Sequence, residues 1–203
     1  MVEPHPYHFS SRKRLFDVVV GGGALLALAP LLAVISLAIL ATAGRPIIYS
    51  QRRTGWRRRA FTLYKFRTMR TDADRVRHKL HHLNQAPLPF FKIFDDPRFV
   101  GIGKWLSQTG FDELPQLVNV LKGEMSLVGP RPLPVAEARR LKSNWNIRFK
   151  VKPGLFSDWT VSEQRHHSLR QWLELDKRTV VNGGPLSDIR TIALTLRHSV
   201  GQL

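Results

Sequence analysis

Two adjacent carboxylates and a basic turn lie close together in the middle of the chain. Asp112 and Glu113 stand near the start of a short apolar-periodic segment, and Arg131 follows within the stiff sequence Gly-Pro-Arg-Pro. A carboxylate near phosphate groups can act as a nucleophile or hold a divalent cation, and an arginine fork binds phosphate oxygens. Each part also has an ordinary explanation, since acidic residues suit a helix N-terminus and Pro-Arg-Pro can form a rigid surface turn. In so basic a chain, their combination favours chemistry on phosphorylated substrates.

Three runs of residues, in this order and spacing, resemble the catalytic core of the bacterial sugar transferases, the monotopic polyprenyl-phosphate phosphoglycosyl transferases. The runs are Asp-Glu-Leu-Pro-Gln at 112–116, Asn-Val-Leu-Lys-Gly at 119–123 and Met-Ser-Leu-Val-Gly-Pro-Arg-Pro at 125–132. Lys13-Arg14-Leu15-Phe16-Asp17 resembles the family's opening signature. The resemblance extends from Arg12 nearly to the C-terminus.

The resemblance implies the substrates and the reaction. The donor would be a UDP-sugar and the acceptor a polyprenyl phosphate (undecaprenyl phosphate), with UMP released. The step would begin the synthesis of a glycan such as an exopolysaccharide, O-antigen, capsule or glycoprotein glycan. Asp112 would attack and form a covalent aspartyl-phosphosugar intermediate, and Glu113, with Asp112, would hold Mg²⁺. The sequence itself does not distinguish the two carboxylates, so the assignment of the attack to Asp112 rests on the resemblance.

Four basic residues are candidates for binding the substrate phosphates. Lys65 and Arg67 belong to Tyr-Lys-Phe-Arg-Thr-Met, Arg131 to Pro-Arg-Pro, and Arg98 to Asp-Asp-Pro-Arg just before the carboxylate pair. An Arg guanidinium binds two phosphate oxygens at once, and a Lys ammonium supplies a point charge. The alternative for Lys65 and Arg67 is a solvated strand face in a very basic protein.

The composition limits the class of partner. The chain carries 32 Lys and Arg residues against 15 Asp and Glu residues, a formal net charge of +17. The expected partner is therefore anionic: nucleic acid, a membrane surface or phosphorylated substrates. Because Arg57-Arg58-Arg59 follows an apolar segment, anionic lipid headgroups explain this run more simply than nucleic acid does. The chain has no Cys, which excludes disulfides, thiolate zinc sites and a cysteine nucleophile.

Residues 18–44 contain no charged side chain, which predicts insertion into a membrane. Basic residues flank both ends of this stretch, although Lys and Arg prefer the cytoplasmic side. Pro30 lies near the middle and should break the helix, because it lacks an N–H and clashes with the preceding turn. Two arms of about 18 Å could then dip into one leaflet and return. We therefore expect a re-entrant helix, with a span and a buried core helix as alternatives. The resemblance implies the same anchor, in the bacterial inner (cytoplasmic) membrane, with the catalytic domain on the cytoplasmic face.

An α+β fold is expected around this anchor. The predicted organisation is a flexible tail over residues 1–11, a re-entrant membrane anchor over 12–44 and a catalytic domain over 45–203. Alternation between residues 44 and 69 predicts a short β-hairpin. A turn followed by a strand is predicted over residues 151–161. Helices, several of them amphipathic and packed at the membrane surface, are predicted over residues 71–83, 97–108, 111–121, 134–143, 169–181 and 186–200.

Three places depart from the family pattern. Ala29 stands where Ser usually precedes the proline, Gly110-Phe111 replaces Ser-Leu, and Ser157-Asp158 lies where the loop after Lys152-Pro153-Gly154 usually has Thr-Gly. A catalytically inactive relative therefore stays an alternative, as does a basic membrane-tethered module that binds lipid or nucleic acid. Such a module has no use for the Asp112-Glu113 pair, which would repel its ligand. The sequence leaves open the sugar, the glycan pathway and the oligomeric state, a homodimer included.

Overall fold

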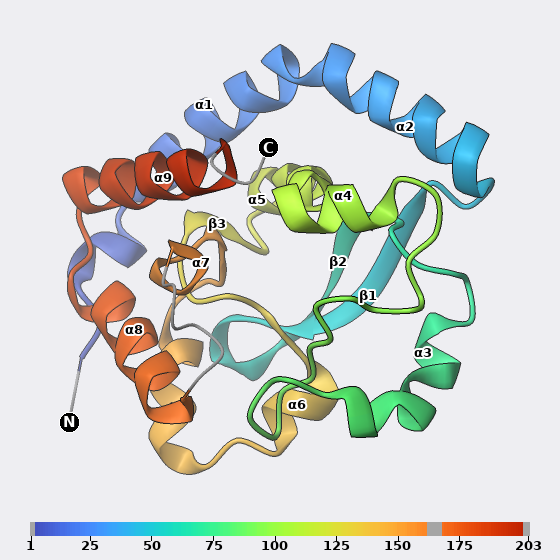
Figure 1. The fold of residues 1–203 in the computed structure, drawn as a ribbon. Helices are drawn as coiled ribbons and strands as arrows, with labels where there is room; N and C mark the ends of the chain where they lie inside the picture. Colours follow the sequence, from blue (N-terminus) through green and yellow to red (C-terminus); the bar gives the residue numbers. More distant parts are fainter. Residues whose placement is uncertain (1–2, 162–167, 201–203) are drawn as a thin grey trace.

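The computed structural model describes residues 3–161 and 168–200, which form a mixed fold of helices and small sheets (Figure 1). An antiparallel sheet has the strand order β2-β1-β4, with β1 at Ile48–Thr54, β2 at Ala60–Phe66 and β4 at Leu133–Pro134. A parallel pair joins β3 at Ser126–Val128 to β5 at Gly154–Phe156. The predicted mixture of helix and sheet is confirmed.

The helices differ in length and type. The longer α-helices are α1 (Ser11–Ala27), α2 (Ala29–Ala43), α8 (Leu169–Val181) and α9 (Pro185–Val200). The shorter ones are α3 (Ala73–Val76), α4 (Gly103–Thr109), α5 (Leu117–Lys122), α6 (Val135–Arg139) and α7 (Asp158–Val161). Segments of 3-10 helix are η1 (Pro6–Phe9), η2 (Trp56–Arg58), η3 (Arg77–Leu83), η4 (Phe111–Gln116) and η5 (Ser143–Lys150).

The β1–β2 hairpin confirms the prediction made from the alternation over residues 44–69. In its register Tyr49 pairs with Lys65 and Arg53 with Phe61, so these four side chains share one face of the sheet. β2 packs against η4, the segment that carries Asp112. The hairpin therefore places Lys65 beside the carboxylate pair.

The N-terminal apolar stretch forms a bent pair of helices that arches over one side of the molecule (Figure 1). α1 and α2 meet at Leu28 with a bend of 57°. Pro30 lies in the first turn of α2, where a helix does not need its N–H. The predicted break is confirmed, and it falls two residues before the proline. Within the described residues no single helix is long and apolar enough to cross a membrane, but this bent pair together meets that test by length and composition.

Buried polar contacts attach the start of α1 to the rest of the protein. The Lys13 ammonium lies 2.9 Å from Asp17 Oδ1 and 2.6 Å from Asp188 Oδ2 of α9. Asp17 Oδ1 also accepts from the Ser126 hydroxyl and the Leu127 amide of β3. The Lys-Arg-Leu-Phe-Asp signature therefore has a structural role, because its two ends join the bent pair to β3 and α9.

The sequence predicted a flexible tail over residues 1–11, and residues 3–11 differ from this prediction. They include η1 and the beginning of α1, where the Ser10 hydroxyl caps the helix. The buried Tyr7 donates its hydroxyl to Asp188 Oδ2 at 3.3 Å. Contacts with distant parts of the chain, which local sequence does not reveal, hold this segment. Residues 1 and 2 lie outside the described part.

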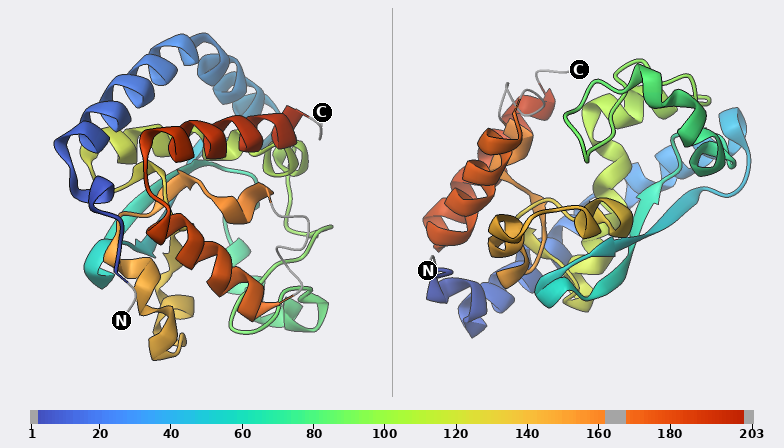
Figure 2. Two further views of the ribbon diagram at one scale, coloured as in Figure 1. Left: turned by 90° about the vertical axis from the view of Figure 1, so that its left-hand side faces the viewer. Right: turned by 90° about the horizontal axis from the view of Figure 1, so that it is seen from below.

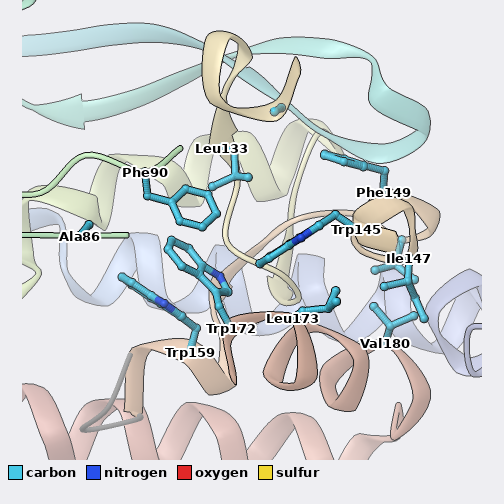
Figure 3. Close-up of a cluster of buried hydrophobic side chains, with 12 residues drawn as sticks. Ala86, Phe90, Leu133, Trp145, Ile147, Phe149, Trp159, Trp172, Leu173 and Val180 are labelled. Carbon is cyan, nitrogen blue, oxygen red and sulfur yellow. The ribbon is translucent and has the colours of Figure 1, made fainter. Parts of the chain in front are cut away.

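Aromatic rings dominate the largest cluster of buried side chains (Figure 3). Phe90 packs on Trp172 with ring centroids 3.8 Å apart, and Trp159 stacks on Trp172 at 4.8 Å. Two further clusters pack the hairpin against α5 and α4 against α2. Each cluster joins segments that are distant in the sequence and holds them in place.

Several predicted segments are shorter than expected or differ in type. Residues 71–83 contain α3 and η3, residues 97–108 are helical within α4 only, and residues 111–121 begin as η4 before α5. Residues 134–143 are helical mainly in α6. In the region 151–161, β5 is followed by α7 where more strand was predicted. Short segments take their conformation largely from tertiary packing, so weak periodicity does not determine it. The predicted helices over 169–181 and 186–200 are confirmed.

α9 lies beneath the arch of α1 and α2 (Figures 1 and 2) and has its polar side buried. Its buried residues include Asp188, Thr191 and Thr195, and Thr191 Oγ1 donates to Asp158 of α7 at 3.0 Å. The residues exposed on α9 include four large apolar ones: Leu186, Ile189, Leu194 and Leu196. The helix is amphipathic as predicted, with apolar side chains pointing outward.

Candidate active site

The carboxylate pair lies in η4, directly after a sharp turn. α4 is capped by Gly110, whose φ of +77° is a left-handed conformation that glycine adopts without strain. Phe111 then packs edge-on against Trp105 of α4, with ring centroids 5.4 Å apart. The departure Gly110-Phe111 therefore has a local structural basis, because it turns the chain and fastens Asp112 and Glu113 to α4.

Two cations lie against these carboxylates. The Lys65 ammonium donates to Asp112 Oδ2 at 3.1 Å and to Glu113 Oε1 at 3.0 Å. Arg131 donates through Nη1 and Nη2 to the two oxygens of Glu113, a bidentate pair. All four side chains are largely buried. The structure thus brings together Lys65 and Arg131, two of the four predicted phosphate-binding residues, with the predicted dyad.

The two carboxylates have different electrostatic environments. Burial raises the pKa of Asp112; the Lys65 charge opposes this, and the negative charge of Glu113 adds to it. Burial acts on Glu113 too, but Arg131 and Lys65 together hold its pKa well below the usual range. Both oxygens of Glu113 accept from cations, whereas Asp112 Oδ1 accepts from no group within the described residues. Asp112 therefore has the oxygen that is available to react.

A cavity of about 1170 Å³ contains the carboxylate pair. Residues of α1 and α9 line one part of it with apolar side chains: Val20, Ala24, Leu28, Ile192 and Leu196. Another part is polar and aromatic, and is lined by residues near α6 and η3: Arg77, Phe90, Phe91, Glu137 and Trp172. The bent helix pair and α6 lie on opposite sides of the molecule (Figure 1). The cavity therefore joins an apolar side to a polar and aromatic side, with the dyad in its lining.

Arg67 lines this cavity, but protein acceptors hold its guanidinium. Its Nε donates to the Pro46 carbonyl, and its Nη2 donates to the carbonyls of Ala43 and Gly44, each at 2.6 Å. These carbonyls lie at the end of α2, where a helix leaves acceptors without partners. In this structure Arg67 joins the bent pair to the hairpin, and its role in phosphate binding stays a prediction.

Arg98 is likewise used within the protein. Its Nη2 lies 2.6 Å from Asp96 Oδ2, its Nε donates to Asp96 Oδ1, and its Nη1 donates to the Ala73 carbonyl. It makes no contact with the dyad among the described residues. Arg98 fixes the loop that precedes α4 and also lines the cavity, so its role in phosphate binding stays a prediction.

Arg53 was not predicted and lies in the same cavity. Its Nη1 donates to the Pro132 carbonyl at 3.1 Å, while its buried Nε has no partner within the described residues. Burial, with the neighbouring Arg131 charge, lowers the pKa of Arg53 to about 10, so it stays protonated at neutral pH. Period-two alternation could have found it, because it shares the face of Lys65 once the hairpin register is known.

The departure Ser157-Asp158 connects the C-terminal helices to the site. The Asp158 carboxylate accepts from Thr179 of α8 and from Thr191 of α9, each at 3.0 Å. The next residue, Trp159, lies with its ring 5.2 Å from the Arg131 guanidinium. Asp158 therefore supports the segment that packs against Arg131, a role that sequence spacing could not reveal.

The residues present fit Mg²⁺ only together with substrate oxygens. The described residues contain no group of three or more His, Cys, Asp or Glu that could hold a metal, but the dyad supplies two carboxylates. Mg²⁺ is commonly bound by one or two carboxylates plus phosphate oxygens and water. The Lys65 ammonium already bridges the two carboxylates. A Mg²⁺ ion between them would require this ammonium to move, and a substrate phosphate is the natural acceptor for it.

Comparisons with known proteins find relatives that match nearly the whole length of this chain. A family model described as bacterial sugar transferase matches residues 8–202. Galactosyl transferase CpsE of Streptococcus agalactiae is 37% identical over 95% of this chain and 43% of its own length. Exopolysaccharide production protein ExoY of Sinorhizobium fredii is 35% identical over 91% of this chain and 83% of its own length.

A third relative has a more specific name. UDP-glucose:undecaprenyl-phosphate glucose-1-phosphate transferase of Escherichia coli is 33% identical over 91% of this chain and 39% of its own length. The chain thus spans about two fifths of this protein and of CpsE, and most of ExoY.

Proposed function

The chain belongs to the bacterial sugar transferase family, and on this premise we propose that it transfers a sugar 1-phosphate from a UDP-sugar to undecaprenyl phosphate and releases UMP. The name of the Escherichia coli relative states this kind of reaction for that protein. The name of ExoY refers to exopolysaccharide production, which supports a role at the beginning of a surface glycan.

One observation carries the proposal: Asp112 has a carboxylate oxygen without a partner in the described structure, beside a Glu113 whose two oxygens are both engaged. A free carboxylate oxygen in the wall of a large cavity is what a nucleophile needs, whereas an engaged one orients its neighbours. This difference supports Asp112 over Glu113 as the attacking group.

The proposed reaction has two displacements at one phosphorus. Asp112 Oδ1 attacks the phosphorus next to the sugar, and the bond from that phosphorus to the bridging oxygen breaks, so that UMP leaves with the electron pair. The aspartyl-phosphosugar intermediate is then attacked by an oxygen of undecaprenyl phosphate, and the Asp112 carboxylate leaves. Lys65 and Arg131 lie where they can neutralise the phosphate oxygens during both steps.

Mg²⁺ is part of the proposal, with Asp112 and Glu113 as its protein ligands. When bound, the ion would neutralise charge on the pyrophosphate of the donor. Glu113 would stay ionised for this role, since Arg131 and Lys65 keep its pKa low. Arg131 would also hold Glu113 in place, since it donates to both carboxylate oxygens.

The bent helix pair is proposed as a re-entrant anchor in the cytoplasmic membrane, with the catalytic part on the cytoplasmic face and anionic headgroups around it. Large apolar residues of α1 and α2 are exposed, among them Leu15, Val19, Leu26, Val34 and Leu37. α9, which runs beneath the arch of α1 and α2 (Figure 2), also exposes large apolar residues. The apolar part of the cavity lies against α1 and α9, which supports entry of the lipid acceptor from the membrane on that side.

The test is the release of UMP by the purified full chain in detergent, with Mg²⁺, undecaprenyl phosphate and a panel of UDP-sugars. We expect UMP release with at least one sugar, dependent on the lipid acceptor for repeated turnover, together with a sugar-linked lipid product. UMP release without any lipid product would contradict transfer to the acceptor. If neither UMP nor a lipid product forms with any of the sugar nucleotides, the chain is better explained as an inactive relative or a binding module.

A further inference from the structure

The loop that follows η3 is held firmly although it has no regular secondary structure. The Asn84 side chain uses both its acceptor and its donors inside this loop. Its Oδ1 accepts from the amides of Ala86 and Lys92, and its Nδ2 donates to the carbonyls of Ala86 and Phe90. The Gln85 amide donates to the Lys92 carbonyl at 2.8 Å. The backbone of Lys92 is therefore fixed through both its N–H and its C=O.

The residues that flank Lys92 are fixed as well. Phe90 packs on Trp172 in the aromatic cluster (Figure 3). The guanidinium groups of Arg77 and Arg98 lie 4.6 and 5.4 Å from the centre of the Phe91 ring. The fold therefore fixes the backbone from which the flexible side chain of Lys92 extends.

Lys92 lines the cavity of the carboxylate pair, and its ammonium has no partner within the described structure. Burial lowers the pKa of Lys92, and the charges of Arg131 and Lys65 lower it further. The charges of Asp112 and Glu113 raise the pKa of Lys92, but these two carboxylates already accept hydrogen bonds from Lys65 and Arg131. A partly buried cation beside two others is unfavourable by itself, and an anion bound at this point would relieve the repulsion.

The position of the loop selects between the two phosphate-bearing substrates. Arg77, at the start of η3, pairs with Glu137 of α6 at 2.7 Å, and Ala86 and Phe90 belong to the same buried cluster as Leu133 next to α6. This side of the molecule lies away from α1 and α2 (Figure 1). In the proposed function the lipid acceptor enters at α1 and α9, so the loop faces the soluble donor.

We propose that Lys92 binds the nucleotide-side phosphate of the sugar nucleotide and neutralises the charge that this phosphate gains as UMP leaves. The inference rests on the proposed function. When Asp112 Oδ1 bonds to the sugar-side phosphorus, the bond to the bridging oxygen breaks and its electron pair stays on that oxygen. UMP leaves as a dianion, and Lys92 remains protonated throughout, so no proton is transferred.

The direct test is UMP binding to the full chain in detergent with Mg²⁺, measured by calorimetry without lipid acceptor. Lys92→Met removes the charge and keeps most of the apolar stem, and we expect UMP to bind about ten- to a hundredfold more weakly. Lys92→Arg keeps the charge and should retain most of the affinity. Lys104→Met is the matched control, because Lys104 is exposed and its ammonium pairs with Asp95 at 2.8 Å, away from the dyad. It should bind UMP like the wild type.

Two further measurements show whether Lys92 binds the donor or the acceptor, and whether it has only a structural role. The KM for undecaprenyl phosphate should change less than about twofold in Lys92→Met, while inhibition by UMP weakens in parallel with binding. A rise in the acceptor KM with unchanged UMP affinity would assign Lys92 to the lipid phosphate and overturn the proposal. Equal UMP affinity in Lys92→Met and Lys104→Met would also overturn it, as would wild-type protein that binds inorganic phosphate as tightly as UMP.

Folding is checked by thermal unfolding of each variant, and Lys92→Gln replaces Lys92→Met if the latter unfolds early. Failure of the proposed function would look different, because the binding experiment does not need turnover. If UMP binds and depends on Lys92 but no lipid product forms, the inference stands and the transferase assignment fails. If lipid product forms but the wild type shows no UMP binding, the transferase assignment stands and the inference fails.

Discussion

The ammonium of Lys65 lies 3.1 Å from Oδ2 of Asp112, and it is the one cation that contacts this carboxylate within the described residues. The same ammonium reaches Glu113 at 3.0 Å. Without substrate it therefore neutralises a buried carboxylate whose burial favours the protonated form. A phosphate group in the cavity can draw Lys65 away, which would expose the second oxygen of Asp112 when the attack begins.

Asp112→Asn should reduce turnover by about a thousandfold or more, because an amide is a poor nucleophile, while the fold persists in this nearly isosteric variant. With the correct UDP-sugar and Mg²⁺ but no lipid, the wild type should gain the mass of a sugar phosphate on the peptide that contains Asp112. Intact-protein and peptide mass spectrometry check this. Asp95→Asn, an exposed carboxylate paired with Lys104, is the control and should behave like the wild type. Near-normal turnover of Asp112→Asn would point to direct transfer between bound substrates.

Lys65→Met should move the acidic limb of the pH–rate profile to higher pH. Asp112 must be ionised to attack, and Lys65 is the largest cause that lowers its pKa against the effect of burial. Removal of this charge raises the pKa of Asp112, so activity is lost at a higher pH as the solution is acidified. The residual rate of adduct formation, measured from pH 5 to 9, gives the midpoint. Lys122→Met, which removes an exposed lysine near Tyr64, should leave the midpoint unchanged.

Glu113→Gln should increase the Mg²⁺ concentration needed for half-maximal activity by about tenfold, if Glu113 is a ligand of the ion. Chelation by EDTA should abolish turnover of the wild type and added Mg²⁺ should restore it. Titration of Mg²⁺ at saturating UDP-sugar measures the shift. An unchanged Mg²⁺ requirement, with only the maximal rate reduced, would assign Glu113 to orientation of Arg131 and Lys65 alone.

Arg67→Lys should destabilise the protein by about 2 kcal/mol, since lysine cannot serve the three carbonyls of Ala43, Gly44 and Pro46 together. The thermal midpoint in detergent should fall, whereas the KM values of the folded enzyme should stay near those of the wild type. Arg52→Lys, an exposed residue of the same hairpin, is the control. A stable Arg67→Lys variant with a raised KM for the UDP-sugar would instead support the predicted role of Arg67 in phosphate binding.

Both ends of the bent pair should face the cytoplasm. Single cysteines at Ser11 and Ser50, both exposed, can be introduced into this cysteine-free chain and tested with an impermeant thiol reagent in intact cells. We expect protection of both positions until the cells are opened. Pro30→Leu should restore the missing N–H and favour a straight helix, so that one of the two positions becomes labelled from outside. If only one of the two cysteines were labelled from outside while Pro30 is intact, the bent pair would cross the membrane and the re-entrant model would be wrong.

Sequence alone identified the features that depend on local physical chemistry or on a long exact motif. A proline cannot lie beyond the first turn of a helix without breaking it, so a break was expected at Pro30, and the alternation over residues 44–69 was clear enough to predict the hairpin. The Asp112-Glu113 pair and Arg131 were found through the motif around them. These predictions required no knowledge of distant contacts.

The tertiary structure decided which of the basic side chains reach the dyad. Lys65 and Arg67 stand two residues apart, and alternation alone places both on one face. β2 ends at Phe66, however, and Arg67 turns to the carbonyls at the end of α2, more than twenty residues earlier. Lys92 lies in a loop without periodicity, and the Asn84 hydrogen bonds position it. A side chain's partners depend on where the chain returns in space, and spacing along the sequence does not carry that information.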